Sequence, residues 1–98
     1  MGFWLRVNTF LLRKTKMQIL KFSAEWCNPC KQLSKLLEKL DIDVIEKDID
    51  LEENQDLLTK YKIRSVPTLV AVKDDIVEGV ISGSVSESRL RDWLAIVG

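Results

Sequence analysis

The apolar residues of this chain gather first in a short segment and then in a helical pattern. Residues 17–23 (MQILKFS) contain four apolar residues and predict a buried strand. From Asn28 to about Leu40, apolar residues return every three or four positions, which predicts a helix. They are Cys30, Leu33, Leu36, Leu37 and Leu40. Pro29 suits the first turn of this helix, because the N–H group that proline lacks would have no partner there.

The remaining pattern predicts five more elements. They are a strand at 43–49, a helix at 52–61, two strands at 68–73 and 76–81, and a last helix through Val97. Apolar and charged residues alternate in DVIEKDI at 43–49, as expected for a half-buried strand. Asp74 and Asp75 separate two apolar runs and predict the turn of a hairpin. Ser86 is a candidate N-cap for the last helix.

The order of these elements, β-α-β-α-β-β-α, predicts the fold class. It begins as an α/β protein and then changes to an antiparallel hairpin. Two strands joined through a helix are expected to lie parallel with a right-handed crossover. We therefore expect an α/β fold with one central mixed sheet and helices on both of its faces.

Composition and charge limit the classes of function. The chain has 98 residues, enough for one domain with its own core, and 46% of them are hydrophobic. Its formal net charge is zero, but residues 1–16 are basic and without acids, so residues 17–98 are mildly acidic. An acidic domain of this kind lacks the basic surface that binds nucleic acid. Nothing in 17–98 is long and apolar enough to span a bilayer.

Both cysteines of the chain lie in SAEWCNPCK at residues 23–31. A structural disulfide closing so short a loop would constrain the unfolded chain only weakly. Structural zinc takes four Cys or His ligands, and the chain has two cysteines and no histidine, so only a dimer could complete such a site. Two incidental cysteines at a helix start are a further, minor alternative. The interpretation that remains is a redox-active pair.

The position of the cysteines predicts how such a pair would work. Cys27 precedes the predicted helix and Cys30 lies in its first turn. The N–H groups and the dipole at a helix N-terminus stabilise negative charge, so they favour the thiolate of Cys27. That thiolate would attack a disulfide, and Cys30 would then resolve the mixed disulfide.

Three motifs together resemble the thioredoxin family. They are SAEWCNPCK at 23–31, YKIRSVPTLV at 61–70 and ISGSVSESRL at 81–90, and they fall in the family's order over about residues 17–97. The resemblance implies a thioredoxin-like fold with a cis Val66–Pro67 bond beside the cysteines. It also implies a substrate-binding surface around the cysteines, in which Val66 offers backbone hydrogen bonds to the substrate chain. The substrate-binding residues implied are Trp26, Asn28, Pro29, Val66 and Gly83.

Two departures from the family pattern concern the chemistry. Asn28 replaces the familiar glycine between the cysteines, and no histidine is present, which favours a reductase over an oxidase or isomerase. The family usually pairs a buried aspartate with a lysine on the next strand, whereas Lys21 and Glu46 stand at these positions with the charges exchanged. We expect the pair to assist proton transfer at Cys30, with Glu46 accepting through water and Lys21 stabilising the thiolate. The alternative is two unrelated charges whose side chains reach water.

Residues 1–16 (MGFWLRVNTFLLRKTK) are predicted to be an N-terminal extension preceding a thioredoxin-like domain at 17–98. They are too few for the family's usual first strand and helix, so we expect a compact thioredoxin without that unit. An amphipathic helix on the sheet, an extra edge strand and a true start at Met17 are open alternatives. The segment lacks a small-residue cleavage site, which argues against a secretory signal. Binding to a membrane surface is the less favoured alternative.

These observations predict a cytoplasmic, monomeric protein-disulfide reductase with Cys27 as nucleophile, Cys30 as resolving cysteine and Pro67 shaping the site. The dithiol is its own redox centre, so no bound cofactor or metal is expected. Disulfide-containing proteins would be its substrates, and a reductase of the thioredoxin-reductase type would supply electrons. One alternative is a glutaredoxin-like enzyme using glutathione, although Gly83 is not paired with a second glycine. The other is a thioredoxin-fold binding subunit of a larger complex.

Overall fold

The computed structural model describes residues 17–98, and the expectations for residues 1–16 lie outside these residues. The elements follow the predicted order. They are β1 (Gln18–Ser23), α2 (Asn28–Lys39), β2 (Ile45–Asp48), the 3₁₀ turn η1 (Glu52–Asn54), α3 (Gln55–Lys60), β3 (Thr68–Lys73), β4 (Ile76–Ser82) and α4 (Glu87–Val97).

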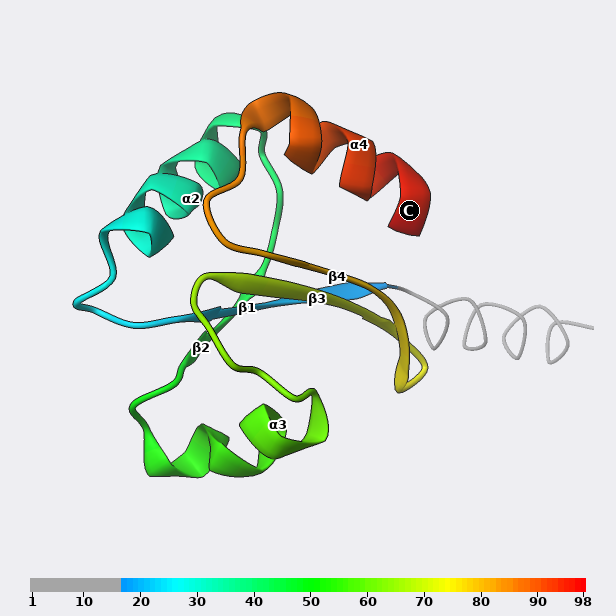
Figure 1. Cartoon of the computed structure of the whole chain (residues 1–98). Helices are drawn as coiled ribbons and strands as arrows, with labels where there is room; N and C mark the ends of the chain where they lie inside the picture. Colours follow the sequence, from blue (N-terminus) through cyan, green and yellow to red (C-terminus); the bar gives the residue numbers. More distant parts are fainter. Residues whose placement is uncertain (1–16) are drawn as a thin grey trace, which may run out of the picture.

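The four strands form one mixed sheet in the order β2-β1-β3-β4. Strands β1 and β2 are parallel, as predicted from the helix between them, and the other two pairs are antiparallel. Helices α2 and α4 lie on one face of the sheet and α3 lies on the other (Figure 1). The predicted fold class, a central mixed sheet with helices on both faces, is confirmed.

Two elements differ from the sequence prediction. Strand β2 is shorter than 43–49, because it pairs only with the segment of β1 from Leu20 to Ser23. The expected helix at 52–61 divides into η1 and α3. At the division, the side chain of Asn54 donates to the carbonyl oxygen of Asp48 at 2.8 Å, which ties the 3₁₀ turn back to the end of β2.

The core consists of two apolar layers, one on each face of the sheet. The first lies under α2 and α4, where Leu33, Leu37, Leu90 and Trp93 pack with Leu69 of β3 and its neighbours. The second lies over α3 and is built around four buried residues, Leu20, Phe22, Val70 and Val72. Burial of these side chains removes apolar surface from water on both faces and fixes the sheet between the helices.

The turn of the hairpin and the N-cap of the last helix lie where the sequence predicts them. Asp74 and Asp75 have φ values of 53° and 65°, the left-handed conformation that a tight two-residue hairpin turn requires. Ser86 is the N-cap of α4, and its side chain accepts a hydrogen bond from the backbone N–H of Arg89 at 3.2 Å. No helix within residues 17–98 is long and apolar enough to cross a membrane.

Gly79 of β4 allows α4 to pack closely on the sheet. A Cβ atom added there would lie 2.5 Å from Cγ1 of Val97 and 3.2 Å from Nε1 of Trp93. We therefore expect Gly79→Ala to lower the free energy of unfolding by about 1–2 kcal/mol, because neither neighbour is a flexible chain end. Urea denaturation followed by circular dichroism measures this change. The neighbouring exposed substitution Glu78→Ala is the control, and equal effects of both would contradict the explanation.

Candidate active site

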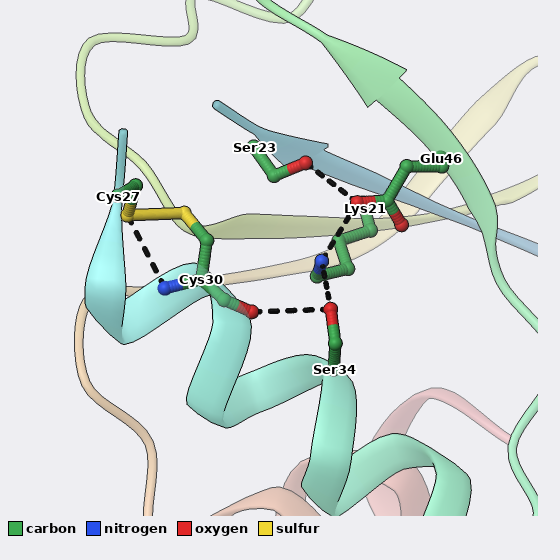
Figure 2. Close-up of polar contacts among 6 residues, drawn as sticks. All are labelled: Lys21, Ser23, Cys27, Cys30, Ser34 and Glu46. Atoms are coloured by element: carbon green, nitrogen blue, oxygen red, sulfur yellow. Dashed lines mark hydrogen bonds and ion pairs between the residues drawn. A yellow bond between two sulfur atoms is a disulfide. The ribbon is translucent and has the colours of Figure 1, made fainter. Parts of the chain in front are cut away.

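Cys27 and Cys30 form a disulfide at the N-terminus of α2. Cys27 is the N-cap residue, and its sulfur accepts a hydrogen bond from the backbone N–H of Cys30 at 3.2 Å (Figure 2). Pro29, between them, occupies the first turn of the helix. The same N–H group and the positive end of the helix would act on a thiolate at Cys27 once the disulfide is reduced.

The disulfide is largely buried, with 5% of Cys27 and 2% of Cys30 exposed. Together with Ala24 the two cysteines form a small apolar cluster, against which Ile49 and Val66 pack. Asn28 and Pro29, between the cysteines in sequence, are exposed. To reach the two sulfur atoms, the disulfide of a substrate therefore has to pass the residues that surround the cysteines.

The segment before β3 lies against this cluster. Its Val66–Pro67 peptide bond is cis, and Val66 is the residue that contacts the cysteine cluster. The backbone N–H of Gly83 donates to the carbonyl oxygen of Pro67 at 3.0 Å. Gly83 has a φ of 85°, a conformation that favours glycine. The structure thus brings Val66, Pro67 and Gly83, which are distant from the cysteines in sequence, into one region.

An apolar pocket opens next to the cysteines. It has a volume of about 160 Å³ and is lined by Trp26, Ile49, Leu58, Ile63, Arg64, Ser65 and Val66. Trp26 is 66% exposed, and its indole N–H donates to a carboxylate oxygen of Asp50 at 2.9 Å. Trp26 is therefore not a core residue. It forms part of an exposed apolar surface, and one hydrogen bond fixes the orientation of its indole ring.

Lys21 and Glu46 form an ion pair beside the cysteines. They are direct partners in the parallel β1–β2 register, and the ammonium nitrogen of Lys21 lies 2.8 Å from Oε1 of Glu46. The side chain of Lys21 is only 2% exposed, whereas that of Glu46 is 54% exposed. The two charges are thus paired, and the lysine does not extend to water. The pair adjoins a cavity of about 290 Å³ that Cys30 also lines.

Two serines extend this pair into a network that sequence reasoning missed. Ser23 donates to Oε1 of Glu46 at 2.6 Å, and Lys21 donates to the hydroxyl oxygen of Ser34 at 2.6 Å. Ser34 in turn donates to the carbonyl oxygen of Cys30 at 3.2 Å (Figure 2). The spacing contained a signal for both serines. Ser23 follows Lys21 by two residues on the same strand face, and Ser34 follows Cys30 by four on the same helix face.

The site contains a chemically complete redox pair. Two cysteines that bond to each other at a helix N-terminus, next to an exposed apolar surface, define the class of thiol–disulfide exchange proteins. Among residues 17–98, no group of three or more His, Cys, Asp or Glu side chains could hold a metal ion.

Comparisons with known proteins agree with this class. The sequence model of the thioredoxin family matches residues 6–96. The chain is 34% identical over 89 residues to a thioredoxin of Buchnera aphidicola, covering 87% of this chain and 82% of the relative. It is 36% identical over 80 residues to a thioredoxin of Pseudomonas aeruginosa, covering 78% and 74%.

Solved structures show the same likeness. A mutant thioredoxin from Halobacterium salinarum is 33% identical, with a TM-score of 0.66 over 84% of this chain and 75% of the other. Thioredoxin O2 from Arabidopsis thaliana in its oxidised state is 25% identical, with a TM-score of 0.70 over 93% and 85%. The chain belongs to the thioredoxin family. It is a protein-disulfide oxidoreductase whose redox centre is the pair Cys27 and Cys30.

Proposed function

We propose that this protein works as a reductase of protein disulfides, with Cys27 as the nucleophile and Cys30 as the resolving cysteine. The observation that carries the assignment of roles is the hydrogen bond from the Cys30 N–H to the Cys27 sulfur at the helix N-terminus. This hydrogen bond and the helix dipole stabilise negative charge at Cys27. Cys30 lies within the helix and is 2% exposed, which supports a role for it in the second step.

The reaction proceeds in two exchange steps. The Cys27 thiolate attacks one sulfur of the substrate disulfide, forms a mixed disulfide and releases the other substrate sulfur as a thiolate. Cys30 then loses its proton, and its thiolate attacks the Cys27 sulfur. The Cys27–Cys30 bond forms, and the second substrate sulfur leaves. The protein loses two electrons and the substrate gains them, and each released substrate thiolate takes up a proton from solvent.

The surface around the cysteines is the proposed binding site for the substrate chain. The backbone of Val66 would pair with an extended segment beside the disulfide, in the manner of an added strand. Trp26 and the apolar pocket next to it would hold a neighbouring side chain. Asn28, Pro29 and Gly83 complete the rim of this site. Its contacts are largely apolar or made by backbone groups, which suits a protein with several substrates.

Lys21 and Glu46 are the proposed proton-transfer pair for the second step. Glu46 is half exposed and would accept the proton of Cys30 through water in the cavity that both residues line. The Lys21 ammonium would stabilise the thiolate that remains. This arrangement would perform the deprotonation of Cys30 with a lysine on β1 and a carboxylate on β2.

We further propose a monomeric, cytoplasmic protein with no bound cofactor, supplied with electrons by a separate reductase of the thioredoxin-reductase type. The domain would comprise residues 17–98, with residues 1–16 as an extension. A chain beginning at Met17 tests this boundary, because it should fold and retain its activity.

Reduction of insulin tests the proposed function and the donor together. The oxidised protein is mixed with insulin, NADPH and either thioredoxin reductase or glutathione with glutathione reductase, and NADPH consumption is followed. We expect turnover with thioredoxin reductase and little with glutathione. Turnover supported only by glutathione would favour the glutaredoxin-like alternative. No reduction with either donor, or with chemical dithiol, would overturn the reductase assignment.

A further inference from the structure

Ser34 links the buried ion pair to the active-site helix. The ammonium of Lys21 has three protons, and two of them are donated to Glu46 on β2 and to Ser34 on α2. Ser34 passes the connection on to the carbonyl oxygen of Cys30. The ammonium is therefore two hydrogen bonds away from the residue that carries the resolving sulfur, and Figure 2 shows it between strand and helix.

Glu46 and Ser34 contact the Lys21 ammonium from different elements of the fold. Glu46 belongs to an edge strand, and its side chain is half exposed, so this partner alone would leave the ammonium free to turn toward solvent. A lysine amine is a compact charge on a flexible stem, and its position depends on where its acceptors lie. Ser34 is the acceptor on the side of Cys30, and it is partly buried against the same cavity.

We propose that Ser34 is a positioning residue, which holds the Lys21 ammonium beside Cys30 so that the charge stabilises the Cys30 thiolate during resolution of the mixed disulfide. This inference rests on the proposed function. Ser34 makes no bond in the reaction. Its hydroxyl oxygen accepts from Lys21, and its hydroxyl group keeps its own proton, donated to the carbonyl oxygen of Cys30, throughout.

Other charges face the same cavity and set the background for this effect. Besides Lys21 and Glu46, the charged residues that line it are Glu25, Lys31 and Asp48. Three carboxylates near the cavity oppose ionisation of a thiol, because like charges disfavour the thiolate. The position of the ammonium therefore matters more than it would at a neutral site. Lys31 is exposed, so solvent screens its contribution.

The test uses a chain in which Cys27 is replaced by serine, so that Cys30 is the only thiol. This chain imitates the mixed disulfide, in which Cys27 carries no charge, and serine retains the helix cap. The pKa of the Cys30 thiol is measured by thiolate absorbance in this background. We expect Ser34→Ala to raise this pKa by about half a unit and Lys21→Met by about one unit or more. Ser34→Thr, which keeps the hydroxyl, should restore the starting value.

A double variant of Lys21 and Ser34 shows whether Ser34 acts through Lys21 or directly on the Cys30 thiol. If Ser34 acts only through Lys21, adding Ser34→Ala to Lys21→Met should change the thiol pKa no further. Ser88→Ala, on the exposed first turn of α4, is the matched serine control and should change nothing. An unchanged pKa in Ser34→Ala, or an undiminished shift in the double variant, would overturn the inference.

The outcome is distinguishable from failure of the proposed function. In the chain with both cysteines, Ser34→Ala keeps the dithiol and should still reduce insulin. The inference predicts that the resolution step of this variant requires a higher pH. Its pH–rate profile should shift upward by the same half unit, which corresponds to about a threefold loss of Cys30 thiolate at a pH below the midpoint. A wild-type chain without any disulfide reduction would instead refute the function itself.

Discussion

Replacing Cys27 with serine should lower the turnover of disulfide reduction by about a thousandfold or more, because it removes the sulfur at the N-cap of α2 that makes the first attack. Cys30→Ser should lower turnover to a similar degree but through a different step. Cys27 would still attack, since its sulfur and the helix that stabilises its thiolate remain. The reaction would then stop at the mixed disulfide, because no second sulfur can resolve it.

The two variants are distinguished by the species that accumulates. After incubation with an oxidised substrate, non-reducing electrophoresis and intact mass should show the mixed disulfide with Cys30→Ser and none with Cys27→Ser. The chain with both cysteines replaced is the control. Retention of disulfide reduction by that chain would mean that the chemistry lies elsewhere, and accumulation of the adduct with Cys27→Ser would reverse the two roles.

Removing one or the other partner of the Lys21–Glu46 pair should have opposite effects on stability. Glu46→Ala leaves the buried ammonium of Lys21 with a single neutral acceptor, Ser34, so we expect the free energy of unfolding to fall by about 2–4 kcal/mol. Lys21→Met instead replaces the buried charge with an apolar side chain and leaves Glu46, which is half exposed, hydrated by solvent. Its free energy of unfolding should stay within about 1 kcal/mol of the wild type or rise.

Urea unfolding of the oxidised proteins measures this asymmetry. The double variant Lys21→Met/Glu46→Ala should be close to Lys21→Met alone, because the carboxylate has no buried charge left to compensate. Glu78→Ala, which removes an exposed carboxylate from β4, is the control and should change stability little. Equal losses from Lys21→Met and Glu46→Ala would mean that burial of the ammonium is not the cause.

The fold could be predicted from the sequence because its elements are strongly patterned. The helical spacing from Cys30 to Leu40 and the two apolar runs around Asp74 and Asp75 each indicated an element that the structure contains. The division of 52–61 could not be predicted, because it depends on Asn54 reaching the backbone of Asp48, a contact between separate elements. Local spacing carries no information about such contacts.

The site was predictable to a different extent. The resemblance to the thioredoxin family implied that Lys21 and Glu46 stand at paired positions, so the ion pair could be expected before its geometry was known. The spacing of Ser23 and Ser34 placed them on the same faces as Lys21 and Cys30, but it did not show that their hydroxyl groups donate to Glu46 and to the carbonyl oxygen of Cys30. The polar network around Cys30 therefore emerged only from the arrangement of α2 against β1.

The sulfur of Cys27 also closes the first turn of α2, so one atom serves both the reaction and the secondary structure. Favourable interactions are mutual: a helix that stabilises a thiolate is itself stabilised by that anion. With Cys27 as the proposed thiolate, reduction would replace a neutral acceptor with a charged one, and charged acceptors hold amide protons more strongly. The first turn of α2 would therefore be more stable in the reduced protein than in the oxidised protein.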